Sequence, residues 1–331
     1  DKYNVTTIYI GGGTPSAIES KNIVKILEKI KQVIKIEDLR NIETTIEINP
    51  GTITKQKLLD YKQAGINRIS IGLQSTNDKI LKNIGRIHSY QDFLDSYQLI
   101  RSIGFNNVNV DLMIGLPNQT IKDIKESIEK IVNSKYGKPE HISTYSLIIE
   151  PNTQIEKLID ENKMKLPTDE EERKQYDYVK NMLELNEYEH YEISNFALKG
   201  KRSKHNTNCW EQKEYIGFGV AAHSYINKKR FSNTENLNTY LQKDYKEIKT
   251  IHEIQNIEEE QKEYMLLGLR KIDGIEISKF KEKFNGINPI FLFRNELEKL
   301  TKQKLIKIDL DNIKLTKKGL DLANIVWEEF I

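Results

Sequence analysis

Short apolar runs rich in β-branched residues alternate with longer amphipathic segments along the first part of the chain. Six runs predict strands, the last more weakly than the others: Val5–Ile10, Thr44–Ile48, Arg68–Leu73, Asn107–Met113, Ile142–Ile148 and Tyr188–Ile193. Segments between them repeat apolar residues at spacings of three and four and predict helices: Lys21–Ile34, Lys55–Ala64, Gln91–Ile103, Ile121–Val132 and Glu170–Leu185. Thr54 and Thr120 are predicted N-caps. This alternation predicts a parallel sheet covered by helices.

A doubly wound sheet and a barrel are both compatible with this order of elements. We favour a partial parallel (β/α) barrel because polar or glycine residues follow several of the predicted strands. These residues are Gly11, Gly12, Gly13, Thr14, Glu47, Asn49, Gln74 and Asp111. In a barrel the carboxyl ends of parallel strands share one rim, where barrel enzymes place their chemistry. Each residue taken singly is explained equally well as a turn or cap residue, but their recurrence after four strands favours a site.

The pattern changes near residue 251. Three predicted helices precede two short strands and a last helix: Glu258–Arg270, Ile275–Phe284 and Ile290–Lys302, then Leu305–Ile308 and Ile313–Leu315, with a turn at Asp311-Asn312. This order predicts a C-terminal winged-helix-like α+β module. Its charge is mixed and shows no basic stripe, so we expect a structural or partner-docking role rather than binding to nucleic acid.

These patterns together predict three regions, namely a partial barrel over 1–194, a connecting segment over 195–250 and the winged-helix-like module over 251–331. Within the connecting segment, Asn195–Asn236 is rich in Asn, Gly, His and aromatic residues and has no clear period. Such a stretch predicts either a long loop or a functional lid.

Composition excludes several classes of protein. The chain has 331 residues, enough for a large core, and its 51 basic and 49 acidic side chains leave a net charge of only +2. No overall field therefore attracts nucleic acid or acidic lipid. No apolar run reaches the roughly 18 residues that span a bilayer, and the first residues lack a signal-peptide pattern. We expect a cytoplasmic protein without stable membrane insertion.

The glycine run Gly11-Gly12-Gly13 directly follows the first predicted strand and allows the backbone to approach a ligand closely. By itself it is a weak signal, being neither a Walker loop nor a GxGxxG fingerprint. Read in order with later motifs, it resembles the radical-SAM coproporphyrinogen III oxidase-like family, and most closely its HemW-type haem chaperones. The motifs are Tyr9–Ser16 (YIGGGTPS), Ile46–Pro50 (IEINP), Arg68–Ser75 (RISIGLQS), Gly85–Ser89 (GRIHS) and Val110–Pro117 (VDLMIGLP).

The resemblance implies a site for S-adenosylmethionine. Its amino group would meet the loop of Gly12, Gly13 and Thr14, its ribose would meet Glu47, and Gln74, Arg86 and Asp111 would also contact the cofactor. The chemistry is consistent, since carboxylates accept from ribose hydroxyls and an arginine can face the methionine carboxylate. The alternative is capping or ion pairing for the two carboxylates and a solvated helix end for Arg86.

The resemblance continues almost to the end of the chain and includes the winged-helix-like tail. Further matching segments are His141–Leu147, Glu150–Thr153, Tyr191–Ala197, Tyr215–Gly219 and Ala222–Ser224. One departure concerns the [4Fe-4S] cluster, which family members bind through a CxxxCxxC loop after the first barrel strand. The only cysteine here is Cys209, so neither a disulfide framework nor such a cluster can be built from this chain alone. We expect a truncated chain rather than a degenerate relative, with the cluster cysteines upstream, and no radical chemistry by the chain as given.

The second departure lies in the segment His205-Asn206-Thr207-Asn208-Cys209-Trp210, where HemW-type members carry an HNxxYW motif associated with haem. The resemblance makes His205 a candidate haem ligand. Cys209 is another candidate, and Trp210 could stack on a porphyrin, since imidazole and thiolate both ligate haem iron. The alternatives are a hydrogen-bonded structural histidine and a small buried cysteine. His223 is a further candidate ligand.

As a whole, the resemblance implies a haem chaperone that binds S-adenosylmethionine and haem, holds a cluster when intact, and delivers haem to haem-requiring client proteins. An oxygen-independent coproporphyrinogen III oxidase is the runner-up; in it a 5′-deoxyadenosyl radical would start oxidative decarboxylation of propionate side chains. The His205–Trp210 motif favours the chaperone. A radical-SAM enzyme acting on another substrate remains open, and a nucleic-acid-binding protein is the least favoured alternative.

Overall fold

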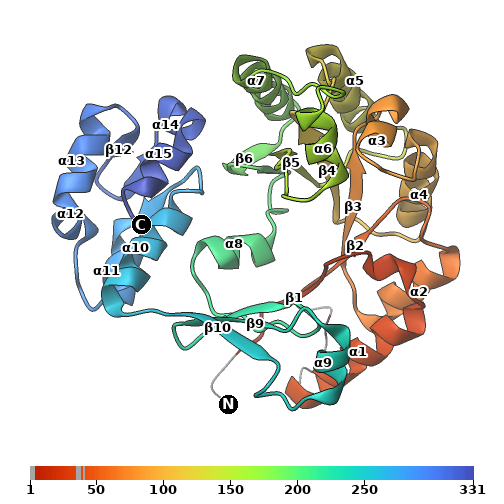
Figure 1. Ribbon diagram of the computed structural model, residues 1–331, viewed down its shortest axis with the longest axis horizontal. Coiled ribbons are helices and arrows are strands. Elements are labelled where there is room, and N and C mark those ends of the chain that lie inside the picture. The colour runs from red at the N-terminus through yellow and green to blue at the C-terminus, as the bar shows by residue number, and fades with distance from the viewer. Residues whose placement is uncertain (1–3, 35–38, 40–41) are drawn as a thin grey trace. The chain divides into compact units, whose positions relative to one another are not determined.

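Parallel strands form most of one seven-stranded sheet in the computed structural model, which describes residues 4–34, 39 and 42–331. The parallel strands are β1 (Thr7–Ile10), β2 (Glu43–Ile48), β3 (Arg68–Gln74), β4 (Val108–Ile114) and β5 (His141–Ser146). A hairpin of β6 (Glu189–Glu192) and β7 (Asn195–Ala197) completes the sheet, with β7 antiparallel to β5. The order β1-β2-β3-β4-β5-β7-β6 forms a curled half-barrel, which confirms the predicted partial barrel (Figure 1).

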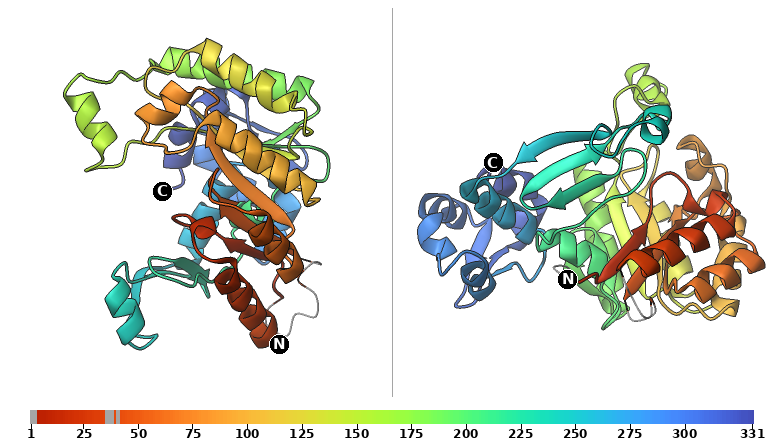
Figure 2. Two further views of the ribbon diagram at one scale, coloured as in Figure 1. Left: turned by 90° about the vertical axis from the view of Figure 1, so that its right-hand side faces the viewer. Right: turned by 90° about the horizontal axis from the view of Figure 1, so that it is seen from below.

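Helices connect these strands (Figures 1 and 2). They are α1 (Ser20–Ile34), α2 (Lys55–Ala64), α3 (Asp78–Asn83), α4 (Tyr90–Ser102), α5 (Ile121–Val132), α6 (Gln154–Asp160) and α7 (Asp169–Leu185). Of these, α1, α2, α4, α5 and α7 cover the outer face of the sheet. The predicted caps are confirmed: the Thr54 side chain accepts from the Lys57 amide, and Thr120 forms a capping box with Asp123.

The two faces of the half-barrel differ in polarity because successive side chains of a strand point to opposite sides. On the outer face the strands contribute apolar side chains to the core under the helices, among them Ile46, Ile48, Ile69, Ile71, Val108, Val110 and Ile142. The positions between them carry the polar side chains of the inner face, among them Glu43, Glu47, Arg68, Ser70, Asn109, Asp111, His141 and Ser143. A polar inner face is the arrangement expected of a barrel that receives a ligand.

One compact unit of the chain ends at His205, and a second begins at Asn206. The second unit contains two antiparallel sheets, ordered β10-β9-β8 and β11-β13-β12. Their strands are β8 (His223–Ile226), β9 (Lys229–Asn233), β10 (Lys249–Ile254), β11 (Ile275–Glu276), β12 (Ile306–Ile308) and β13 (Asn312–Leu315). Its helices are α9 (Leu237–Gln242), α10 (Ile257–Gly268), α11 (Ile277–Lys283), α12 (Pro289–Leu292), α13 (Arg294–Lys302), α14 (Lys317–Asp321) and α15 (Ala323–Glu328).

The prediction of a long loop over Asn195–Asn236 is wrong, whereas the alternative of a functional lid stays a prediction. This segment contains β7, α8 (Lys204–Trp210), β8 and β9, and each element is too short to show a period in the sequence. The change expected near residue 251 falls inside β10. The expected helix Ile290–Lys302 is two helices that meet at Phe293. The first unit ends after His205 rather than after 194, because the β6–β7 hairpin extends the large sheet to Ala197 and His205 contacts Thr7 and Glu43 of the same unit.

Within the described residues, no helix combines the length and the apolar character that crossing a membrane requires.

Candidate functional site

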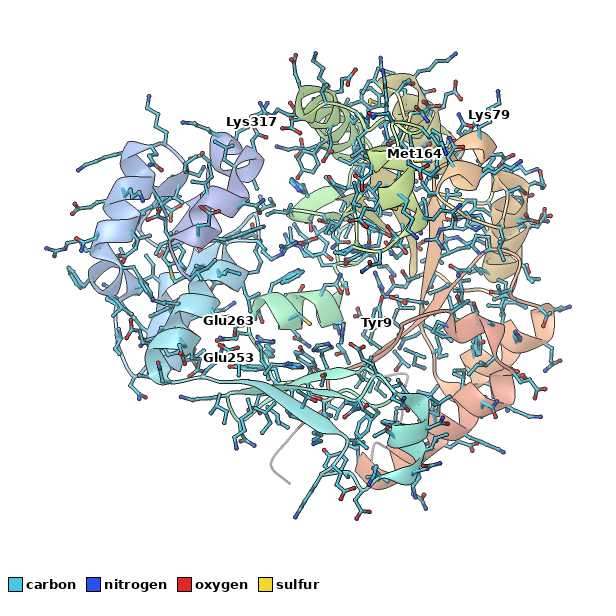
Figure 3. All side chains as sticks on the ribbon, in the orientation of Figure 1. Tyr9, Lys79, Met164, Glu253, Glu263 and Lys317 are labelled. Atoms are coloured by element: carbon cyan, nitrogen blue, oxygen red, sulfur yellow. The ribbon has the colours of Figure 1, made fainter. Side chains whose placement is uncertain are left out.

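The glycine loop after β1 is fixed by the carboxylate of Glu47 at the end of β2. The Gly12 amide donates to Glu47 Oε2 at 3.1 Å, and the Tyr9 hydroxyl donates to Oε1 at 2.6 Å. Tyr9 projects from β1 (Figure 3). Gly12 and Gly13 have φ of +83° and +59°, in the left-handed region that favours glycine. A Cβ at either glycine would meet nothing within 4 Å, so the loop presents its backbone to open space.

The residues that follow the glycines are held by the segment after β2. Asn49 Nδ2 donates to the Thr14 hydroxyl at 2.9 Å, and the Asn49 amide donates to Ser16 Oγ at 3.2 Å. Ser16 is also hydrogen-bonded to Thr52, and Lys57 Nζ donates to the Ser16 carbonyl at 2.6 Å. These contacts fix the loop relative to Glu47, so the two predicted features belong to one local structure.

Asp111 lies on the inner face of β4, where two polar neighbours hold its carboxylate. Asn109 Nδ2 donates to Oδ1 at 2.7 Å, and the Ser70 hydroxyl donates to Oδ2 at 3.4 Å. Burial raises the pKa of Asp111 to about 6, and the charge of Glu47 raises it further, whereas the Asn109 hydrogen bond and Arg68 lower it. Above that pH the group is a carboxylate that can accept from the hydroxyls of a ligand.

Gln74 ends β3 in an unusual backbone conformation, with φ of +69°. Its side chain is buried, and its Oε1 accepts from the Tyr145 hydroxyl at 3.4 Å. Burial raises the pKa of Tyr145, and the charges of Asp111 and Glu47 raise it while Arg86 lowers it. Tyr145 therefore stays a protonated donor that lies within electrostatic reach of three predicted site residues.

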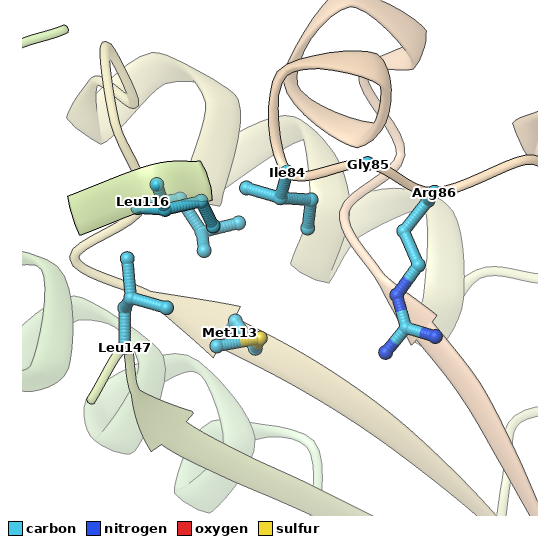
Figure 4. A pocket seen from close by; sticks show the side chains of 7 residues that line it. Ile84, Gly85, Arg86, Met113, Leu116 and Leu147 are labelled. Carbon is cyan, nitrogen blue, oxygen red and sulfur yellow. The ribbon is translucent and has the colours of Figure 1, made fainter. Parts of the chain in front are cut away.

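Arg86 lies in the loop after α3 and lines a pocket of about 290 Å³. The other lining residues are Ile84, Gly85, Met113, Leu116, Leu147 and Ile155 (Figure 4). The guanidinium is partly buried and has no hydrogen bond or ion pair with any residue that the structure describes. An arginine without a partner beside an apolar pocket is suited to an anionic group such as a carboxylate.

His205 lies in the first turn of α8 and contacts β1. Its Nδ1 is 3.1 Å from the Thr7 hydroxyl, and its ring stacks on Tyr9 with centroids 4.7 Å apart. The amides of Lys204 and His205 both donate to the Glu43 carboxylate, at 3.0 and 2.9 Å, which stabilises the start of the helix. Burial lowers the pKa of His205, and the nearby charge of Glu43 opposes that effect. The imidazole is therefore neutral at pH 7.

Cys209 and Trp210 lie in the last turn of α8, in the second unit. Burial raises the pKa of the Cys209 thiol, which favours the thiol over the thiolate that ligates iron. Arg270 lies over the Trp210 ring, 4.3 Å from its centroid, so one face of this ring already has a partner. His223 is exposed on β8 and stacks on His252.

The structure thus brings the Gly12–Thr14 loop, Glu47, Gln74, Arg86 and Asp111 to the same end of the half-barrel. Sequence analysis did not single out Tyr9, Asn109, Tyr145 or His141, which support these residues. The signal that could have found them is the two-residue alternation along each strand, because polar side chains at inward positions stand out in otherwise apolar strands.

A metal cluster is not supported by these residues. Within 4–34, 39 and 42–331 there is no group of three or more His, Cys, Asp or Glu side chains that could hold a metal ion. The chain's single cysteine could supply only one thiolate.

Comparisons with known proteins show which family the chain resembles. A model of the radical SAM superfamily matches residues 1–131, and a model of the HemN C-terminal domain matches residues 257–322. "Heme chaperone HemW" of Bacillus subtilis is 38% identical, with 99% of this chain and 86% of the relative aligned. The protein of the same name in Lactococcus lactis is 35% identical over 98% of this chain and 84% of the relative.

A solved structure shows the same fold. Coproporphyrinogen III oxidase (HemN) of Escherichia coli aligns with a TM-score of 0.81 over 98% of this chain and 77% of that protein, at 20% identity. The fold, the matched models and these relatives define a protein of the radical SAM class. Within that class, the chain belongs to the heme chaperone HemW family.

Proposed function

We propose that this protein binds haem and delivers it, in the cytoplasm, to haem-requiring client proteins. The family relationship supports haem as the cargo, since the similar proteins of B. subtilis and L. lactis are both named heme chaperones. The structural observation that carries the proposal is the state of His205. In the proposed state Nδ1 donates to the Thr7 hydroxyl, 3.1 Å away, so Nε2 keeps the lone pair that an iron ligand needs, and burial favours the neutral ring.

The second part of the proposal is a site for S-adenosylmethionine at the rim of the half-barrel. Gly12, Gly13 and Thr14 would receive its amino group, Glu47 and Asp111 its hydroxyls, and Arg86 its carboxylate, with Gln74 alongside. The open glycine loop and the arginine without a partner both fit such a ligand. A [4Fe-4S] cluster, which the family implies, would have to take its thiolates from elsewhere than the residues described.

Haem transfer to an acceptor tests the proposal. The protein is loaded with one equivalent of haem and mixed with increasing concentrations of the apo form of a b-type cytochrome from the same cell. We expect the client to be loaded at a rate that rises with its concentration, because delivery goes through a complex. Apomyoglobin serves as a passive acceptor, since it gains haem no faster than the donor loses it.

Visible absorption measures both reactions. Loading of the client faster than the passive rate, and increasing with client concentration, supports delivery. Loading at the passive rate at every concentration contradicts delivery, and failure of the protein to bind haem at one equivalent contradicts the proposal altogether. Decarboxylation of coproporphyrinogen by the protein would also contradict it, in favour of an oxidase.

A further inference from the structure

A continuous chain of hydrogen bonds crosses the inner face of the half-barrel and ends at Asp111. Asn109 Nδ2 donates to Asp111 Oδ1 at 2.7 Å, and Asn109 Oδ1 lies 2.6 Å from His141 Nδ1. His141 Nε2 lies 2.8 Å from the Tyr191 hydroxyl, which accepts from the Ser203 amide at 3.3 Å. This series of hydrogen bonds thus joins β4, β5, β6 and the residue just before α8.

All donors and acceptors along this chain agree on one direction. Asn109 uses its amide nitrogen toward Asp111, so its oxygen faces His141 and must accept there. His141 Nδ1 then carries the proton, and Nε2 accepts from the Tyr191 hydroxyl. Burial lowers the pKa of His141 well below its ordinary value, which agrees with a neutral ring that has one donor and one acceptor.

The position of His141 is unusual for a titratable side chain. Its exposed fraction is 0%, and those of Asn109 and Tyr191 are 3% each. Burying polar groups costs free energy that their hydrogen bonds only partly offset, so an apolar barrel layer would serve stability equally well. These hydrogen bonds orient the Asn109 amide so that its nitrogen donates to Asp111.

We propose that His141 is a positioning residue for the cofactor site, holding the Asn109 amide so that it donates to the Asp111 carboxylate. The inference rests on the proposed role of Asp111 in binding S-adenosylmethionine. Without the His141 proton, the Asn109 oxygen keeps only the longer hydrogen bond from the Ser143 hydroxyl, at 3.1 Å, so the amide is held less firmly in this orientation. The Asn109 nitrogen then donates to Asp111 Oδ1 less often, so the carboxylate is stabilised less.

The pH dependence of cofactor binding follows from the groups around Asp111. Glu47 on β2 and the hydroxyls of Tyr9 and Tyr145 face it, as do Arg68 and Ser70 on β3 and Ser143 on β5. Because only the ionised form accepts from two hydroxyls, affinity should rise as pH increases through the Asp111 pKa of about 6. Loss of the Asn109 hydrogen bond removes an effect that lowers this pKa, so the midpoint should move to higher pH.

Two substitutions separate positioning from packing. His141→Asn places an amide nitrogen near the position of Nδ1 and can still donate to Asn109. His141→Gln places its amide near Nε2, where it meets Tyr191 and leaves Asn109 Oδ1 with the Ser143 hydroxyl as its remaining donor. The measurement is the dissociation constant for S-adenosylmethionine by titration calorimetry from pH 5 to 8.5 on the whole chain, with thermal melting as a check of folding.

We expect His141→Gln to weaken binding about tenfold at pH 7 and to move the midpoint to higher pH, whereas His141→Asn stays within about twofold of the wild type. Equal loss in both variants with an unchanged midpoint overturns the inference and leaves His141 a packing residue. Asp111→Asn distinguishes failure of the His141 inference from failure of the proposed cofactor site. If it binds S-adenosylmethionine as well as the wild type, the proposed cofactor site itself is wrong.

Discussion

Replacing Glu47 with glutamine is expected to weaken binding of S-adenosylmethionine by about 10- to 100-fold. The carboxylate accepts from both the Tyr9 hydroxyl and the Gly12 amide, so it holds the glycine loop as well as facing the ligand. Glutamine keeps the shape but offers only one oxygen and turns an N–H toward the other donor. Hydrogen bonds to a charged group contribute about 1.5–3 kcal/mol each, and about 1.4 kcal/mol corresponds to tenfold in affinity.

Titration calorimetry at pH 7.5 provides the measurement. Glu28→Gln is the matched control, because Glu28 is an exposed residue of α1, and we expect it to bind like the wild type. Unchanged affinity of Glu47→Gln would remove Glu47 from the site and, with it, the proposed position of the ligand.

Replacing Gly274 with alanine is expected to destabilise the second unit by about 3 kcal/mol or more. Gly274 precedes β11, which pairs with β13, and a Cβ there would lie 2.2 Å from the Ile313 carbonyl oxygen. The backbone of β13 has little freedom to move away. The glycine also has φ of +74°, so alanine adds a backbone cost of about 1–2 kcal/mol to an overpacking cost of about 1–3 kcal/mol.

Gly286→Ala is the control for the backbone cost alone. Gly286 has φ of +85°, but a Cβ there meets nothing within 4 Å, so we expect a loss of only about 1–2 kcal/mol. Both tryptophans, Trp210 and Trp327, lie in the second unit, so urea unfolding followed by tryptophan fluorescence reports on that unit. Equal stability of the two variants would contradict this expectation, because it would mean that the β13 backbone moves away from the added methyl group.

The regular part of the fold was predictable because each helix buries one face and each strand of the parallel sheet buries at least its outer face. For α2 and α5 the predicted bounds are those observed, and the predicted threonine caps are present. The β6–β7 hairpin and β8 to β10 were harder to predict. Their short strands pair antiparallel with neighbours close in sequence, and only a few alternations mark each one.

Individual residues of the candidate site were predictable where a polar side chain stands out within an apolar strand. Glu47 and Asp111 stand out as carboxylates in apolar strands, and their motifs resemble those of a known family. The supporting contacts were not predictable, because they depend on the register of the sheet. Asn109 meets His141 only because these two residues are paired across β4 and β5. His205 meets Thr7, 198 positions earlier, because the segment after β7 returns to β1.

Haem binding through His205 can be measured by a haem titration followed by visible absorption. The wild type is compared with His205→Ala, Cys209→Ala and His223→Ala, the last being an exposed histidine that controls for nonspecific ligation. We expect a saturable spectrum at one haem per chain that His205→Ala abolishes and the other two variants retain. A His205→Ala protein that gives the same spectrum and the same saturation as the wild type would contradict haem binding through His205.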